Sequence, residues 1–184
     1  MKLIPTRYFL TKGIGIHEKE LRSFEQALRD AGIETCNLIK ISSVIPPGCK
    51  RVSREEGLKG IYPGMMTFAV QAQSQTNEPD QIVTAGIGLA QPTDPQFYGY
   101  MTEVEEMVGI EAPDVARDVE EMAIENLITS WGINADGDDV MRKGKKHYEF
   151  DGRKVEVDSL VASAKGHEQR LWTTVLVAAV FLFD

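Results

Sequence analysis

Two adjacent serines, Ser42 and Ser43, stand just before a point where the chain must turn. The segment 36–41 predicts a short strand that leads into them, and a Pro-Pro-Gly run at 46–48 follows. Because proline has no backbone N–H to donate to a neighbouring strand, this run forces the chain out of the sheet. The turn could hold the Ser42–Ser43 peptide exposed and strained, so that the Ser43 hydroxyl attacks the Ser42 carbonyl and the acyl group moves from nitrogen to oxygen.

An amide in the same segment could assist this chemistry. The side chain of Asn37, five residues before Ser42, could position the attacked carbonyl or stabilise the negative charge that develops on its oxygen. Two serines before a bend are also ordinary turn residues, and an asparagine at a strand edge commonly bonds to the backbone. The spacing alone leaves both interpretations open.

A group of acidic residues surrounds Glu103, near the end of a predicted strand. If this segment is extended, Glu103 and Glu105 point to one side of it and Glu106 points to the other. An apolar pocket or the neighbouring carboxylate would raise the pKa of Glu103, which would then donate a proton near neutral pH. A solvated strand end is the alternative explanation for this acidic cluster.

The rest of the chain must supply the elements that position these residues. Apolar residues recur at helical spacing in two segments, and Gly32 lies where the first helix should end. The apolar run 171–183 predicts a buried central strand, because thirteen residues are too few to cross a membrane as a helix. Two helices layered on six or more antiparallel or mixed strands form an α+β sandwich. Helices are predicted at 19–31 and 111–131, and strands at 7–16, 36–41, 66–72, 81–90, 97–104, 147–150, 153–157 and 171–183.

The composition argues against several classes of protein. A length of 184 residues favours one domain, and a net charge of −8 counts against binding to a nucleic-acid backbone. The two cysteines and three histidines are too scattered for a structural zinc site or a disulfide framework. The N-terminal residues lack the apolar stretch of a signal peptide. We therefore expect a cytoplasmic protein without a metal and without a membrane or nucleic-acid partner.

Several segments closely resemble one enzyme family, the pyruvoyl-dependent arginine decarboxylases. The most specific is Asn-Leu-Ile-Lys-Ile-Ser-Ser-Val-Ile-Pro-Pro at 37–47, and the resemblance continues at 24–33, 84–88 and 99–105. The helix at 111–131 and the C-terminal apolar strand follow in the order typical of the family. The resemblance therefore spans most of the chain.

This resemblance implies a self-processing enzyme built as a four-layer αββα sandwich with mainly antiparallel or mixed sheets. Residues 1–184 would form one domain, cut between Ser42 and Ser43 into a β chain, 1–42, and an α chain, 43–184. Ser43 would become a covalent pyruvoyl group, so that neither a metal nor pyridoxal phosphate is needed. Residues 141–158 look like an inserted hairpin, whose Asp151-Gly152 pair suits a type I′ turn.

The resemblance also implies the reaction and the residues that carry it. L-Arginine would be converted to agmatine and CO2 through a Schiff base, for polyamine biosynthesis or acid resistance. Glu103 would be the proton donor, and Asn37 would act in carbonyl positioning and processing. The expected assembly is a trimer of processed αβ units with active sites between neighbours.

Two positions bear on the substrate. Where this chain has Glu25, the family has aspartate, whose carboxylate is associated with the substrate guanidinium. Glutamate keeps the charge but is one methylene longer, so another basic amino acid (ornithine, lysine or histidine) is an alternative substrate. Leu21, one turn earlier, matches an apolar position that lines the substrate site, although core packing would also explain it.

A hypothesis from another class is an unprocessed, non-catalytic assembly protein that keeps the fold. The presence of Ser42, Ser43 and Glu103 argues against it.

Overall fold

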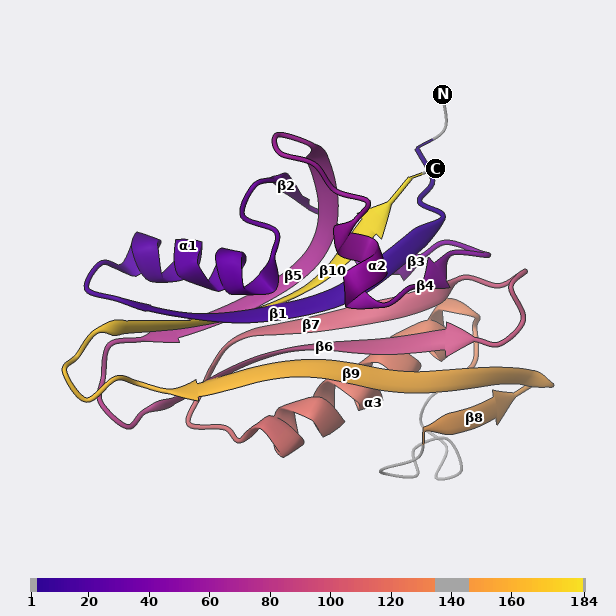
Figure 1. Cartoon of the computed structure of the whole chain (residues 1–184). Helices are drawn as coiled ribbons and strands as arrows, with labels where there is room; N and C mark the ends of the chain where they lie inside the picture. Colours follow the sequence, from indigo (N-terminus) through magenta and orange to yellow (C-terminus); the bar gives the residue numbers. More distant parts are fainter. Residues whose placement is uncertain (1–2, 135–145, 184) are drawn as a thin grey trace.

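The computed structural model describes residues 3–134 and 146–183, which form two five-stranded sheets packed face to face between helices (Figure 1). Sheet A has the order β2 (Asn37–Lys40), β5 (Met66–Thr76), β10 (Trp172–Leu182), β1 (Arg7–His17) and β4 (Lys50–Arg51). Sheet B has the order β3 (Val44–Ile45), β7 (Gly99–Val108), β6 (Ile82–Pro92), β9 (Arg153–Lys165) and β8 (His147–Phe150). The helices are α1 (Glu20–Ala31), α2 (Arg54–Leu58) and α3 (Ala112–Ser130).

The layers follow the order helix, sheet, sheet, helix. α1 packs on the outer face of sheet A against β1 and β10, and α3 packs on the outer face of sheet B against β6, β7 and β9 (Figure 1). An apolar core between the sheets includes Tyr8, Ile87 and Met101. The predicted α+β sandwich with four αββα layers is therefore confirmed.

The C-terminal apolar run forms the middle of sheet A. β10 pairs antiparallel with β1 on one side and with β5 on the other. Its side chains from Thr173 to Leu182 are all buried, because one face of the strand meets α1 and the other meets sheet B. The prediction of a buried central strand is confirmed. No helix in the described part of the chain has the length and apolar character to cross a membrane.

The helices α1 and α3 lie unusually close to their sheets, over glycines that leave room for the helix backbone. A Cβ added to Gly15 in β1 would lie 1.9 Å from the carbonyl oxygen of Ser23 in α1. A Cβ added to Gly88 in β6 would lie 2.0 Å from the carbonyl oxygen of Val119 in α3. Any larger residue would push the helix off the sheet at these two positions.

We expect Gly88→Ala to lower the free energy of unfolding by about 1–3 kcal/mol, the usual cost of overpacking. Gly86→Ala is the matched control, because its added Cβ would meet the Cγ1 of Val115 at 2.9 Å, and a side chain can adjust where a carbonyl cannot. Denaturant unfolding of the two variants at one protein concentration measures the difference. Equal losses of stability would contradict the importance of the close approach by the α3 backbone.

The hairpin predicted around Asp151-Gly152 is present. β8 pairs antiparallel with the start of β9, and positive φ angles of 48° and 74° at Asp151 and Gly152 fit the type I′ turn. β9 then continues along β6 as an inner strand of sheet B. The proposal that 141–158 is an insertion stays a prediction, and residues 141–145 lie outside the described part.

Candidate active site

The chain passes from sheet A to sheet B at Ser42 and Ser43, and we call this point the Ser42–Ser43 crossing. On one side, the N–H of Ile41 donates to the carbonyl oxygen of Ala69 in β5 at 3.0 Å. On the other side, the N–H of Met101 in β7 donates to the carbonyl oxygen of Ser43 at 2.7 Å. The bond between the serines is therefore anchored to a different sheet at each end.

The crossing is open to solvent. Ser42 is exposed, Ser43 is half-buried, and the backbone bends at Ser43. The exposure agrees with the sequence-based expectation. Neither serine has a positive φ, and the strain expected of this peptide stays a prediction. The change of direction is spread over residues 43–48 and completed by a turn in which the N–H of Cys49 donates to the carbonyl oxygen of Pro46 at 3.1 Å.

Glu103 lies in β7 beside this crossing. Val44 pairs with Tyr100, which places Ser42 opposite Thr102 and one register position from Glu103. Because side chains alternate along a strand, Glu103 points to the same face as Met101, toward the space between the sheets. Burial raises the pKa of the Glu103 carboxyl, the charge of Lys40 opposes this rise, and the charge of Glu105 adds to it. The pKa of the Glu103 carboxyl therefore lies above its ordinary value, which is the direction that favours a proton donor.

Asn37 begins β2, at the far end of that strand from the crossing. The four residue steps of extended chain from Asn37 to Ile41 span about 13 Å. The Asn37 Nδ2 donates to the carbonyl oxygen of Gly64 at 2.9 Å, which is the backbone bond expected of an asparagine at a strand edge. Within one chain, the structure does not bring this amide to the carbonyl of Ser42.

Glu25 and Leu21 lie on exposed parts of α1, which packs on the outer side of sheet A, and Leu21 lines a hollow beside β5. Glu25 is exposed and lines a hollow of about 280 Å³ together with Arg22 and Arg29. Leu21 is 71% exposed, so the alternative that it is an ordinary core residue is wrong. The structure thus brings Ser42, Ser43 and Glu103 together and leaves the other three predicted site residues elsewhere.

Comparison with known proteins gives this geometry a context. The family model described as pyruvoyl-dependent arginine decarboxylase matches residues 7–184. A probable pyruvoyl-dependent arginine decarboxylase of Chloroherpeton thalassium is 42% identical over 182 residues, which cover 99% of this chain and 100% of the relative. The pyruvoyl-dependent arginine decarboxylase of Methanococcoides burtonii is 41% identical over 98% of this chain and 99% of its own. The chain belongs to the pyruvoyl-dependent arginine decarboxylase family. The resemblance seen in the sequence is confirmed.

As a member of the pyruvoyl-dependent arginine decarboxylase family, the chain is an enzyme, and its family depends on a covalent pyruvoyl group. Within the described residues there is no cluster of three or more His, Cys, Asp or Glu side chains suited to a metal ion. The Ser42–Ser43 crossing lies within the 37–47 motif, which is the most specific part of the resemblance, and the half-buried Glu103 lies beside it.

Sequence reasoning missed one residue at this site of the decarboxylase fold, Lys40. Its Nζ lies 2.5 Å from the Oε1 of Glu105, and it is the cation whose charge acts on Glu103. Its position two residues before Ser42 was the available signal. The contact itself depends on the two sheets meeting, which no local pattern encodes.

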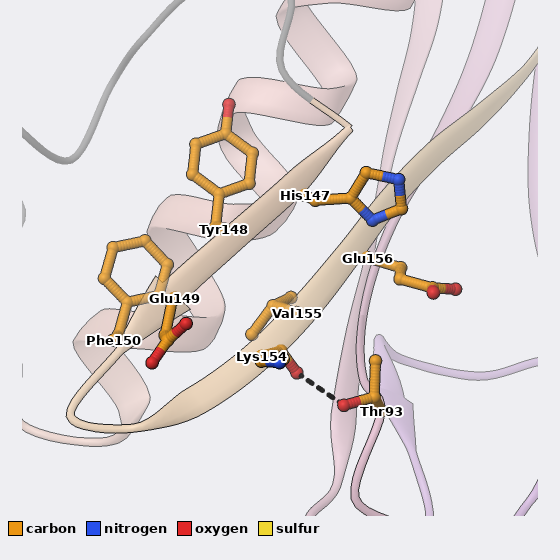
Figure 2. A pocket seen from close by; sticks show the side chains of 8 residues that line it. All are labelled: Thr93, His147, Tyr148, Glu149, Phe150, Lys154, Val155 and Glu156. Carbon is orange, nitrogen blue, oxygen red and sulfur yellow. Dashed lines mark hydrogen bonds between the residues drawn. The ribbon is translucent and has the colours of Figure 1, made fainter.

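A hollow of about 560 Å³ lies at the opposite edge of sheet B, over the β8–β9 hairpin (Figure 2). Figure 2 shows Tyr148 and Phe150 on one side of β8, where their rings stack with centroids 5.9 Å apart. Across the hollow, the hydroxyl of Thr93 donates to the carbonyl oxygen of Lys154 at 3.4 Å. No predicted site residue lines this hollow, so it is separate from the Ser42–Ser43 crossing.

Proposed function

We propose that this enzyme cuts its own chain between Ser42 and Ser43 and then decarboxylates L-arginine to agmatine and CO2. Membership in the pyruvoyl-dependent arginine decarboxylase family supports the reaction. The observation that carries the proposal is the position of the Ser42–Ser43 bond, which is exposed, anchored at both ends and adjacent to Glu103. Agmatine would enter polyamine biosynthesis or serve acid resistance.

The cut begins with the Ser43 hydroxyl, which adds to the Ser42 carbonyl. The C–N bond between the serines breaks, and an ester forms between the Ser42 carbonyl and the Ser43 oxygen. Elimination then removes the Cα proton of Ser43 and breaks its Cβ–O bond, which forms a Cα=Cβ double bond and releases the carboxylate of Ser42. Water then replaces the backbone nitrogen of residue 43, which leaves as ammonia. A pyruvoyl group remains at the start of chain 43–184. The hydrogen bonds of Ile41 and Ser43 to separate sheets keep both ends in place during these steps.

Decarboxylation leaves an electron pair that must be accommodated and a carbon that must be protonated. The pyruvoyl group supplies a ketone that takes up the substrate α-amine as a Schiff base and accepts the electron pair. The Met101 N–H holds the adjacent carbonyl of Ser43, and this donor would stabilise negative charge on that oxygen. Glu103 delivers the proton to the former α-carbon, because its raised pKa keeps it protonated at higher pH than an exposed glutamate.

Assembly would explain the positions of Glu25, Leu21 and Asn37. We propose a trimer of processed αβ units in which these residues of one unit reach the Ser43 of a neighbour. The exposure of Glu25 and Leu21 on the outer layer supports this arrangement. A native mass equal to one αβ unit would contradict it.

The test of the cut is an intact-mass measurement of the purified protein. The proposal requires two fragments, 1–42 and 43–184, with Ser43 replaced by a pyruvoyl terminus. A single full-length chain that releases no CO2 from arginine would favour the alternative, a non-catalytic assembly protein.

We expect arginine to be decarboxylated faster than ornithine, lysine or histidine, as measured by CO2 release. Glu25→Gln should raise the KM for arginine roughly 10-fold or more, because a hydrogen bond between charged groups contributes about 1.5–3 kcal/mol. Glu34→Gln, at an exposed glutamate after α1, is the matched control and should leave KM unchanged. Equal rates on all four amino acids would instead support the same chemistry on another basic substrate.

A further inference from the structure

Lys40 and Glu105 form an ion pair beside the Ser42–Ser43 crossing. Lys40 belongs to β2 in sheet A and Glu105 to β7 in sheet B, so the pair joins the two sheets where the chain itself passes between them. The Lys40 side chain is 45% exposed and that of Glu105 is 40% exposed. An exposed pair of this kind contributes little to stability, so its position is the more informative property.

Both partners are placed close to the reacting groups. Lys40 precedes Ser42 by two residues, and Glu105 follows Glu103 by two residues in the same strand. Residues two apart in a strand share a face and lie about 7 Å apart. Glu103 therefore has a carboxylate on one side along its own strand, and the Lys40 ammonium approaches from the neighbouring sheet.

The other described groups around Glu103 and the hollow beside it carry no positive charge. In the described part of the chain, Lys40 and Glu105 are the charged side chains that act on the Glu103 carboxyl. β6 places Ile87 opposite Glu103. A hollow beside Glu105 is lined by uncharged side chains and by one further carboxylate, that of Glu106. The φ of Glu106 is 57°, which interrupts the regular strand. The uncharged lining residues are Gln73, Ser74, Gln75, Val108 and Trp172.

We propose that the Lys40–Glu105 pair is a positioning element of the active site, which ties β2 to β7 beside the Ser42–Ser43 bond and holds Glu103 next to two opposite charges. This inference rests on the role proposed above for Glu103. While the pair is intact, its two charges oppose each other at the Glu103 carboxyl, and that of Lys40 has the larger effect. Removal of either partner leaves the charge of the other uncompensated.

Two single variants test this inference because they act in opposite directions. Lys40→Met leaves the negative charge of Glu105, which disfavours ionisation of Glu103. The fall of kcat at alkaline pH, which we call the alkaline limb, therefore moves to higher pH. Glu105→Gln leaves the positive charge of Lys40, which favours ionisation, so this limb moves to lower pH. A unit charge about 7 Å away in a water-like dielectric changes a protonation equilibrium by about threefold. Activity on the alkaline limb should therefore fall about threefold in the second variant and rise by at least as much in the first, because the charge of Lys40 acts on Glu103 more strongly than that of Glu105.

Further variants separate this effect from a general loss of structure. The double variant Lys40→Met/Glu105→Gln should return toward the wild-type profile. Added salt should shrink both single-variant shifts, because it screens exposed charges. Arg117→Met breaks a similar exposed pair with Asp114 on α3, whose atoms lie 2.6 Å apart, and should leave the limb in place.

The intact mass of each variant gives the fraction of cut chain, and kcat is expressed per cut chain. If Lys40→Met prevents the cut, the test rests on Glu105→Gln. Lys40→Arg is then the control, because it keeps the positive charge and should show the alkaline limb of the wild type. If Glu103→Gln is strongly impaired but the two limbs stay fixed or move in the same direction, this inference is wrong and the proposed function still stands. A fully active Glu103→Gln enzyme would overturn the proton-donor role and this inference with it.

Discussion

Ser43→Ala is expected to remain one chain of 184 residues and to release no CO2 from arginine. The variant lacks the hydroxyl that attacks the Ser42 carbonyl, so neither the ester nor the pyruvoyl group can form. Because Ser43 is half-buried and its carbonyl makes the bond to Met101, the alanine side chain fits and the fold should persist. Intact mass and a CO2-release assay together measure the result.

Ser42→Ala is the matched control for this experiment. Ser42 is exposed and contributes its carbonyl to the proposed cut, whereas its hydroxyl takes no part. This variant should therefore be cut and should remain active. A Ser43→Ala protein that separates into fragments of 42 and 142 residues would contradict the assignment of Ser43 as the attacking group.

Glu103→Gln is expected to be cut normally and to decarboxylate arginine about 10²- to 10⁴-fold more slowly, the usual contribution of a general acid. Glutamine keeps the size of the side chain but has no proton of suitable acidity. In the wild-type enzyme the donor must be protonated, so activity should fall as the pH rises through the raised pKa of Glu103. The residual activity of the variant should lack this alkaline limb.

Glu106→Gln controls for the loss of one negative charge from this acidic strand. Glu106 is exposed, and its left-handed backbone takes it out of the alternation that Glu103 and Glu105 follow. We expect its kcat and pH profile to match those of the wild type. If Glu103→Gln decarboxylates arginine at the wild-type rate, the proton must come from another group.

The long helices and strands could be predicted because the pattern that defines each of them lies among residues that are close together in the sequence. The helical spacing of apolar residues and the position of Gly32 define α1, and Gly32 ends it with a φ of 78°. The elements β3, β4 and α2 could not be predicted, since two to five residues show no periodicity. They exist because of partners far along the chain, as when Val44 pairs with Tyr100.

The same distinction applies to the candidate site. The Ser42–Ser43 pair and Glu103 are visible in the sequence, because their chemistry is a property of residue type. Their proximity depends on the pairing of β3 with β7, which no local pattern contains. Leu21 shows the opposite case. Its spacing matches the apolar face of α1, but other residues of the helix make the buried contact with sheet A, so Leu21 stays exposed at the edge of that contact.

The location of β1 has a consequence for how the mature enzyme can fold. β1 lies between β10 and β4 in sheet A, and it pairs with β10 along its whole length. After the proposed cut, β1, α1 and β2 belong to a separate polypeptide whose side chains complete the core of the other. Unfolding of the cut protein then yields two molecules, and their reassembly depends on protein concentration. The proposed cut would therefore turn the folding of a single chain into the association of two fragments.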